Sequence, residues 1–238
     1  MKESTTSCGR LLVGTTTELH RQAAALVAAV RPGGVVALSG GLTPQGWFRW
    51  CVQTGALPAA VVAETHFTVS DERCVPLTDP MSNFGHADEL LLEPLHVPPA
   101  HRHPWAVGLA PAEAAADHGA TIRTLAGPGR AYEVCFLGLG EDSHTASLFP
   151  GSPLLRDDQG ELFAPVEAPG KGWRLTITPT GLRACRLIVV LALGAGKAAA
   201  LERVLRGPAD PDRVPAQTLW ACAAQVLWLV DEAAAGQV

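Results

Sequence analysis

Residues 138–151, which read GLGEDSHTASLFPG, place a histidine and a carboxylate close together in a glycine-rich stretch. His144 lies two residues after Asp142, and the apolar run EVCFLGLG comes before both. A histidine can take up a proton at neutral pH, and a neighbouring carboxylate can fix its tautomer and orientation. We therefore predict that His144 is a general base oriented by Asp142. A lone histidine is more often structural, so this interpretation depends on polar groups elsewhere in the chain.

A second glycine-rich stretch, SGGLTP at residues 39–44, follows the apolar run VVAL. Gly40 and Gly41 can adopt positive φ and expose backbone N–H groups at the start of a helix, where Thr43 is the expected N-cap. This arrangement suits a phosphate group. An ordinary turn between a strand and a helix explains the glycines equally well, and the stretch matches neither the dinucleotide-binding nor the Walker pattern.

A third polar cluster, SDERCVPLTDPMSNFG at residues 70–85, combines an arginine with two carboxylates. Arg73, held by Asp71 and Glu72, offers a planar guanidinium that can bind a phosphate. Surface charges in a loop are the simpler explanation when the segment is considered alone. Because all three clusters follow apolar runs, we expect them to meet at the carboxyl ends of parallel strands.

The elements that position these clusters follow from apolar runs alternating with helical spacing. Strands are expected at 35–39, 65–69, 132–140, 173–178, 186–194 and 224–232, with residues 71–73 in a loop. Helices are expected at 15–30, 43–54, 83–95, 195–207 and 215–221, with a helical turn at 144–149. This alternation predicts an α/β fold with a mainly parallel sheet and helices on both faces. No linker divides residues 1–238, so we expect a single domain.

Composition argues against several other classes of protein. The 238-residue chain carries a net charge of −5, which gives no broad basic face for nucleic acid. No apolar stretch approaches the roughly 20 residues of a membrane span, and no signal-peptide pattern is present. The six cysteines lack CxxC spacing, which indicates a reducing, cytoplasmic environment. No metal is predicted, because the HRH stretch at 101–103 has no further ligand at recognisable spacing.

Taken in order, the clusters resemble those of the 6-phosphogluconolactonase family, within the wider glucosamine-6-phosphate isomerase/deaminase-like group. SGGLTP is similar to the family's SGGxTP, DERCVP with SNFG to its DERxVP and SN, and GLGEDSHTASLFPG to its GxGxDGHTASLFPG. RLTIT, GAGKAAAL and PAQTLW are similar to three later family motifs. The resemblance runs from about residue 35 to residue 231.

The resemblance implies a Rossmann-like α/β sandwich, no organic cofactor, and hydrolysis of 6-phospho-D-glucono-1,5-lactone to 6-phospho-D-gluconate in the oxidative pentose phosphate pathway. It implies a small sugar-phosphate lactone as partner, no nucleic acid or membrane, and a monomer or weak homodimer. Backbone N–H groups of residues 140–145 are the expected donors to the oxyanion. The implied site residues are the base His144 with Asp142, and the phosphate contacts Gly40, Gly41, Thr43, Arg73, Arg174 and Lys197.

Three other functions stay open. A glucosamine-6-phosphate deaminase or isomerase would carry a further glutamate in an Asn-Glu-Pro triplet, where this chain has Phe149 before Pro150, so lactone hydrolysis is favoured. A serine hydrolase is suggested by Ser39 in ALSGG, which lacks the first glycine of a nucleophile elbow. The third is a non-catalytic sugar-phosphate-binding protein, because Ser143 replaces the family's glycine and could tilt His144 if the position needs positive φ.

A further departure from the family lies just before Arg174. Where the family commonly has prolines, this chain has Gly170, Lys171, Gly172 and Trp173. The loop before Arg174 therefore differs in sequence from the family pattern on which the role of Arg174 rests. Lys171 is the alternative phosphate contact, on charge and proximity alone.

Overall fold

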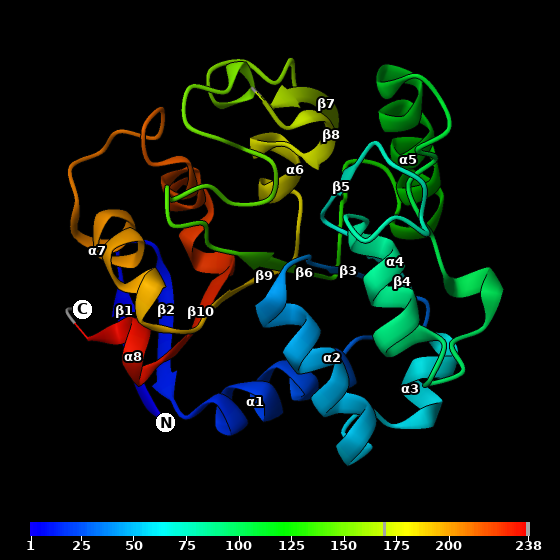
Figure 1. Cartoon of the computed structure of the whole chain (residues 1–238), viewed down its shortest axis with the longest axis horizontal. Helices are drawn as coiled ribbons and strands as arrows, with labels where there is room; N and C mark the ends of the chain where they lie inside the picture. Colours follow the sequence, from blue (N-terminus) through cyan, green and yellow to red (C-terminus); the bar gives the residue numbers. More distant parts are fainter. Residues whose placement is uncertain (169, 237–238) are drawn as a thin grey trace.

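A mainly parallel sheet with helices on both faces forms the centre of the computed structural model, which describes residues 1–168 and 170–236 (Figure 1). In this part of the chain seven strands pair in the order β1-β2-β10-β9-β6-β3-β4, and β1 runs antiparallel to β2 while the other neighbours are parallel. The predicted α/β class and mainly parallel sheet are confirmed.

Apart from the polar, exposed edge strand at residues 2–6, the strands of the large sheet are rich in β-branched and apolar residues, as expected for strands covered on both faces. They are β1 (Lys2–Thr6), β2 (Gly9–Gly14), β3 (Val35–Leu38), β4 (His66–Val69), β6 (Val134–Gly138), β9 (Leu187–Ala192) and β10 (Val226–Asp231). A smaller antiparallel sheet has the order β5-β8-β7, with β5 (Asp71–Arg73), β7 (Phe163–Ala168) and β8 (Gly172–Ile177).

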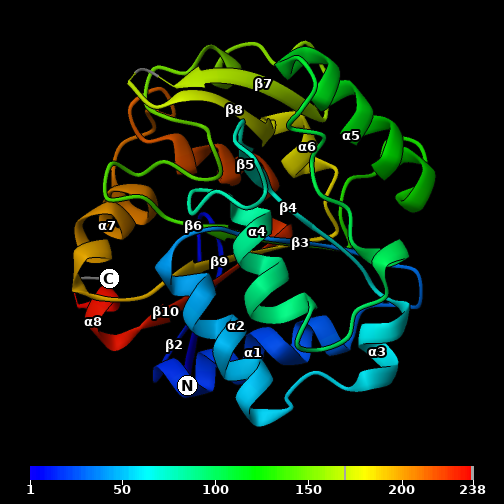
Figure 2. The ribbon, with the colours of Figure 1, turned by 45° about the vertical axis from the view of Figure 1, so that its right-hand side comes forward.

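Figures 1 and 2 show α1, α2 and α4 on one face of the large sheet, and α5, α6 and the small sheet on the other. The α-helices are α1 (Thr16–Ala28), α2 (Leu42–Thr54), α3 (Ala59–Glu64), α4 (Asn83–Ala87), α5 (Pro111–Ala126), α6 (Pro179–Arg183), α7 (Ala198–Arg206) and α8 (Glu232–Ala235). A π-helical turn, Asp88–Leu92, continues α4, and 3-10 segments lie at Pro99–His101, Pro153–Leu155, Ala195–Lys197 and Pro215–Gln225.

Three local expectations are wrong. Thr43 is not the N-cap of α2, because the helix begins at Leu42 and Gly41 caps it with φ of 96°. Residues 71–73 form β5 rather than a loop, since they pair with β8 far along the chain. Residues 144–149 form no helical turn; instead Thr145 and Leu148 make an isolated β-bridge.

Two expectations about helix ends hold. Thr15 caps α1 through a capping box with Glu18, and Gly55 ends α2 in the left-handed conformation. All six cysteines are free. Among the described helices, none combines the length and the apolar character that crossing a membrane would require.

The order of the strands places a site at the carboxyl ends of β3 and β6. From β3 the chain goes to β4 on one side, whereas β6, the next strand of this sheet, lies on the other side of β3. Where the strand order reverses in this way, the loops that follow the two strands diverge and leave a crevice between them. The glycine-rich stretches at residues 39–44 and 138–151 are these two loops.

Acid should destabilise the fold through His118 on α5. Its buried ring stacks on Trp105 with the centroids 3.8 Å apart, and its Nε2 lies 2.9 Å from the Tyr132 hydroxyl. Burial lowers the pKa of His118 to about 3. An unfolded histidine titrates near pH 6.5, so the unfolded state takes up this proton first. The contribution of neutral His118 to the free energy of unfolding is therefore complete above about pH 6.5. Below that pH it decreases by up to roughly 1.4 kcal/mol per pH unit.

As the pH falls from 6.5 to 5, we expect the free energy of unfolding to decrease by about 2 kcal/mol because of His118. Urea unfolding at several pH values measures this loss. Burial also lowers the pKa of His103 to about 4, so His103 contributes to the pH dependence of wild-type stability. The contribution of His118 is therefore the difference between the wild type and His118→Gln. The variant should show a flatter dependence on pH; an identical slope would contradict the assignment.

Candidate active site

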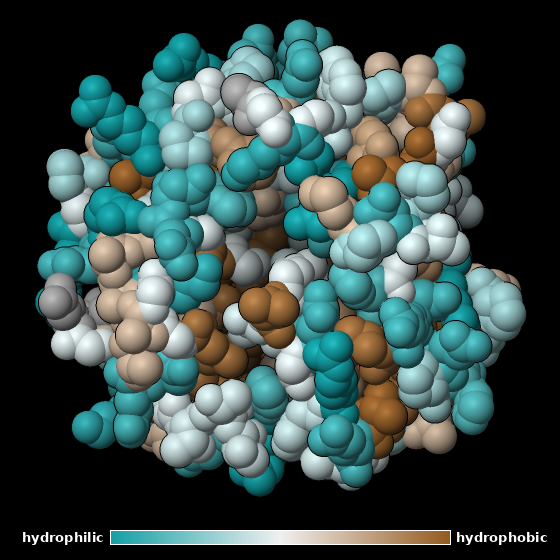
Figure 3. Space-filling view, in the orientation of Figure 1, coloured by the Kyte–Doolittle hydropathy of each residue, from teal (hydrophilic) through white to brown (hydrophobic). Residues whose placement is uncertain are grey.

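A cavity of about 200 Å³ lies at the carboxyl ends of the neighbouring strands β9, β6, β3 and β4. Figure 3 shows a hollow near the middle of this face, where Figure 1 places the start of α2. All three polar clusters reach the cavity, and the loop after β9 adds a lysine. The lining residues are Ser39, Gly40, Gly41, Asp71, Arg73, Asn83, Gly138, Leu139, Gly140, His144, Ala146 and Lys197.

Five of the predicted site residues line this cavity, and they come from four separate segments of the chain. Gly40 and Gly41 follow β3, and Arg73 ends β5. His144 follows β6, and Lys197 immediately precedes α7. Among the described residues that line the cavity, the predicted Asp142, Thr43 and Arg174 do not occur.

His144 and Asp142 form a hydrogen-bonded pair. The Nδ1 atom of His144 lies 2.5 Å from Oδ1 of Asp142, and the His144 backbone N–H donates to the same oxygen at 3.1 Å. Burial acts to raise the pKa of Asp142, but the two hydrogen bonds and the charge of His144 bring that pKa below its ordinary value. An ionised Asp142 accepts the Nδ1–H proton, so the network assigns the free lone pair of His144 to Nε2.

Gly140 allows this pair to form. A Cβ at this position would lie 2.0 Å from Nδ1 of His144 and 2.6 Å from Oδ1 of Asp142. The loop is closed by bonds from the Gly140 N–H to the His144 carbonyl (2.8 Å) and from the Ser143 N–H to the Gly140 carbonyl (3.0 Å). The N–H groups of Gly140, Ser143 and His144 therefore donate inside the loop, so these three of residues 140–145 do not face an oxyanion.

An apolar ring occupies the position where deaminases carry their additional glutamate. The Phe149 ring packs against His144 with centroids 4.7 Å apart. The ammonium of Lys171 lies 4.6 Å from the centroid of the same ring, on the hairpin between β7 and β8. Lys171 is thus near the His144–Asp142 pair, and its charge also lowers the pKa of Asp142.

The two predicted arginines take different positions. Arg73 and Arg174 face each other in the β5–β8 register, and Arg73, whose Nη1 donates to the Met81 carbonyl, lines the cavity. Arg174 is buried, and its Nη1 donates to the carbonyls of Lys171 (2.5 Å) and Trp173 (3.1 Å). Burial and the charge of Arg73 lower the pKa of Arg174. Arg174 therefore holds the turn at 171–173 and adds positive charge behind Arg73.

The glycines before α2 and the residue before α7 complete the predicted phosphate contacts. Gly41 caps the 13-residue helix α2 without a side-chain bond, which leaves the N–H groups of the first turn without a side-chain acceptor. Thr43 is the second residue of that helix. Lys197 lies at the end of the loop after β9. In the strand order β9-β6-β3, His144 therefore lies between Lys197 and the two glycines.

Asn83 is a site residue that the sequence reasoning missed, although the SN pair after DER was noted. Its Nδ2 donates to the Asp71 carbonyl at 2.8 Å, whereas its buried Oδ1 has no hydrogen-bond partner among the described residues. A Cβ on Gly40 would lie 1.7 Å from that oxygen. Gly40 is therefore required to make room for Asn83, whose Oδ1 is buried beside the cavity.

Asp71 was expected to hold Arg73, but the contacts of its carboxylate join residues 70–85 to residues 138–151. Its Oδ2 accepts a hydrogen bond of 2.7 Å from Ser147 Oγ, and its Oδ1 accepts one of 3.4 Å from Ser70 Oγ. The side chain is buried and lines the cavity. A carboxylate therefore faces the same space as Arg73 and His144.

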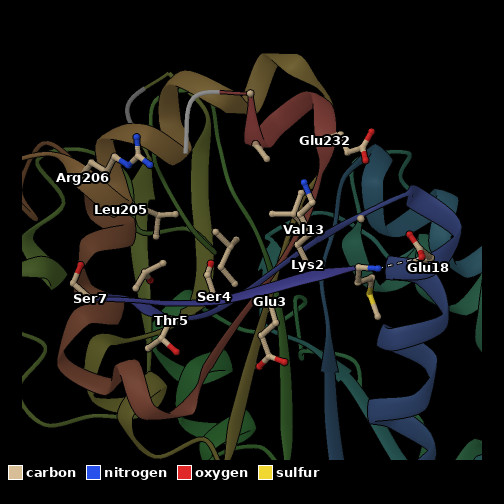
Figure 4. A pocket seen from close by; sticks show the side chains of 16 residues that line it. Lys2, Glu3, Ser4, Thr5, Ser7, Val13, Glu18, Leu205, Arg206 and Glu232 are labelled. Atoms are coloured by element: carbon tan, nitrogen blue, oxygen red, sulfur yellow. Dashed lines mark hydrogen bonds and ion pairs between the residues drawn. The ribbon is translucent and has the colours of Figure 1, made fainter.

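Two other features of the molecule lie away from this cavity. The rings of His66, His101 and His103 lie together, yet in the described ranges no group of three or more potential ligands could hold a metal. A larger hollow of about 1040 Å³ lies beside the β1–β2 hairpin and the ends of α7 and α8 (Figure 4). The predicted site residues are absent from the described part of its lining.

Comparisons with known proteins identify relatives of this chain. A family described as glucosamine-6-phosphate isomerases/6-phosphogluconolactonase matches residues 11–228. The chain is 33% identical to a 6-phosphogluconolactonase of Synechocystis, over 94% of this chain and 91% of that one, and 32% identical to a human 6-phosphogluconolactonase, over 90% and 84%. The solved 6-phosphogluconolactonase of Trypanosoma brucei superposes with a TM-score of 0.80 at 25% identity and full coverage of both chains. The chain belongs to the glucosamine-6-phosphate isomerase/6-phosphogluconolactonase family.

Proposed function

We propose that this chain hydrolyses 6-phospho-D-glucono-1,5-lactone to 6-phospho-D-gluconate, in the oxidative pentose phosphate pathway of the cytoplasm. The observation that carries the proposal is the His144–Asp142 pair beside a cavity that Arg73 and Lys197 also line. A base and separate cationic groups in one cavity suit an ester that carries a remote phosphate. The relatives named 6-phosphogluconolactonase support the same reaction.

In this reaction His144 acts as a general base. Nε2 takes a proton from water while the water oxygen attacks C1 of the lactone, and Asp142 stabilises the resulting imidazolium. The tetrahedral intermediate then collapses by breaking the bond between C1 and the ring oxygen. The imidazolium returns its proton to that oxygen, which becomes a hydroxyl group, and the carboxylic acid product ionises in water.

The phosphate supplies the binding energy that positions the lactone. Arg73 and the backbone N–H groups at Gly40 and Gly41 bind it, with Thr43 in the first turn of α2 and Arg174 behind Arg73 adding to the attraction. Lys197 provides a second positive charge across the cavity. Asn83, which lines the cavity, supports this site through its hydrogen bond to the Asp71 carbonyl.

The structure around His144 bears on the competing functions. Phe149 packs on the imidazole, so the carboxylate that a deaminase would use there is replaced by an apolar ring. Ser39 is buried in the same cavity, but among the described residues no histidine is hydrogen-bonded to it, which argues against a serine nucleophile. Ser143 adopts φ of 67° while His144 keeps its bond to Asp142, so the substitution for glycine leaves the base in place.

The direct test is a coupled assay with freshly prepared 6-phosphogluconolactone, corrected for spontaneous hydrolysis. We expect turnover well above the uncatalysed rate and none with glucosamine 6-phosphate. Tight binding of 6-phosphogluconate without any turnover would contradict the proposal and favour a sugar-phosphate-binding protein.

Replacing Arg73 with alanine should mainly weaken phosphate recognition. Loss of one charge-assisted contact predicts a KM raised by about 10- to 100-fold, with kcat changed by less than about 3-fold. Steady-state kinetics measures both constants. Arg156→Ala is the matched control, because Arg156 pairs with Asp212 and its side chain is 69% exposed. A large fall in kcat at unchanged KM would contradict the assigned role.

A further inference from the structure

Ser143 lies at the centre of the loop that carries the base, and it is held from outside that loop. It is fully buried with φ of 67°. Its Oγ accepts a hydrogen bond of 3.2 Å from Nε of Arg203 on α7, and its carbonyl accepts one of 3.0 Å from the N–H of Ala216. Arg203 also donates from Nη2 to the Glu141 carbonyl at 2.5 Å. One guanidinium therefore contacts the loop at two residues.

We propose that Arg203 is a positioning residue for this reaction, which holds residues 140–144 in the shape that sets His144 against Asp142. The inference rests on the function proposed above, because that function makes His144 the base. Arg203 is not a lining residue of the cavity in the described part of the chain, so it acts through the loop and not on the substrate.

The left-handed conformation of Ser143 explains why such support is needed. Glycine adopts positive φ readily, whereas a residue with a Cβ does so at a cost. The serine hydroxyl also offers an acceptor that glycine lacks, and Arg203 uses it. The Ser143 side chain thus makes the positive φ costly, and the same side chain binds Arg203, which fixes the loop.

The backbone of Arg203 is itself anchored. Its carbonyl accepts a hydrogen bond of 3.1 Å from Nε2 of Gln217, a buried side chain. Gln217 also donates to the Pro208 carbonyl at 2.9 Å and accepts from the Asp210 N–H at 2.7 Å. The guanidinium therefore projects from a fixed point and can fix the loop in turn.

Arg203 also couples two groups that line the cavity. Lys197 lies immediately before α7, the helix that carries Arg203, and the segment after β6 runs beside that helix (Figure 2). A Cβ on Gly196 would lie 3.2 Å from Oε1 of Glu141, so the loops after β6 and β9 are in close contact there. Through α7, Arg203 fixes the place of His144 relative to Lys197.

A double-mutant cycle in Ser143 and Arg203 tests the proposal. Because the phosphate contacts lie on other loops, Arg203→Ala should lower kcat by about 10-fold or more and change KM by less than about 3-fold. Ser143→Gly alone should change kcat by less than about 3-fold. In the glycine background Arg203→Ala should cost only about 3-fold in kcat, since glycine keeps positive φ unaided.

Two further variants separate positioning from a general effect on stability. Arg203→Lys keeps the charge but cannot donate to Ser143 and Glu141 in the same geometry, so kcat should fall to an intermediate value. Arg213→Ala, with an 88% exposed side chain, should match the wild type. All rates are measured well below the melting temperature of each variant. An Arg203→Ala protein of lowered melting temperature but wild-type kcat would overturn the proposal, as would equal losses in the serine and glycine backgrounds.

The wild type is assayed first, which separates this inference from the function on which it rests. If wild-type protein fails to hydrolyse the lactone, the proposed function fails, and a crystal structure of Arg203→Ala then decides the positioning role. We expect His144 to be displaced from Asp142 in that structure. An unchanged 140–144 loop would overturn the inference whatever the activity.

Discussion

Replacing His144 with alanine should lower kcat for 6-phosphogluconolactone by about 10³-fold, since general acid–base catalysis typically contributes about 10² to 10⁴. The expected loss is large because the same imidazole takes the proton from water and returns it to the ring oxygen. Asp142 cannot replace it, since its Oδ1 is bonded to His144 Nδ1 and Asp142 is not among the described residues that line the cavity. The assay for the wild-type enzyme, with its correction for spontaneous hydrolysis, measures the loss.

KM should change by less than about 3-fold in His144→Ala, because the phosphate contacts lie on the loops after β3 and β9 and on β5. Thermal stability should also stay close to that of the wild type. The imidazole is 30% exposed and is in ring contact with Phe149, so its removal opens little buried space. Turnover retained at the wild-type level would remove His144 as the base.

Asp142→Asn is the companion variant for this prediction. An amide can still bond to the imidazole, but it stabilises the imidazolium poorly and can favour the wrong tautomer, so kcat should fall by about 10²-fold. The fold of the loop should survive, because the amide oxygen can still accept from the His144 N–H. Equal rates for Asp142→Asn and the wild type would mean that the carboxylate only shapes the loop.

The parts of this site that the sequence predicts are those set by neighbours in the chain. Glycines after a β-branched run and a carboxylate two residues before a histidine each carry local information. Because parallel strands bring their carboxyl ends to one edge, these local signals placed Gly40, Arg73 and His144 together, whereas Lys197 was expected there from the resemblance to the family.

What the sequence did not predict depends on partners far along the chain. Residues 71–73 are polar and read as a loop, yet they form a strand because β8 pairs with them. Arg174 is charged and was expected in the cavity, yet carbonyls of its own turn hold it in the interior. Likewise, the requirement for glycine at position 40 comes from Asn83, which a local pattern cannot show.

Glu72 shows how a buried charge shapes this site. The side chain is fully buried on β5. Its Oε1 accepts bonds from the N–H groups of Arg73 (2.8 Å) and Asn83 (2.7 Å), and its Oε2 accepts bonds from Ser82 Oγ (3.0 Å) and the Phe84 N–H (2.8 Å). Burial raises the pKa of Glu72, and the four donors oppose that rise. The carboxylate therefore joins Arg73 to the start of α4, where Asn83 lies.

Glu72→Gln should lower the free energy of unfolding by about 2–4 kcal/mol, although the two side chains have the same shape. Each carboxylate oxygen accepts from two donors, so in either orientation the new amide group would face an N–H that it cannot accept from. For a chain of this size the loss corresponds to a fall in melting temperature of roughly 5–15 °C. Differential scanning calorimetry and urea unfolding measure both quantities.

Glu89→Gln, at an exposed position of the π-helical turn after α4, is the matched control and should stay within about 0.5 kcal/mol of the wild type. In the folded Glu72→Gln protein at low temperature, KM should rise by about 10-fold, since Arg73 and Asn83 lose their common anchor. A Glu72→Gln protein as stable as the control would mean that the buried carboxylate does not hold Arg73 to the start of α4. Stability lost without any change in KM would mean that it supports α4 but not the phosphate site.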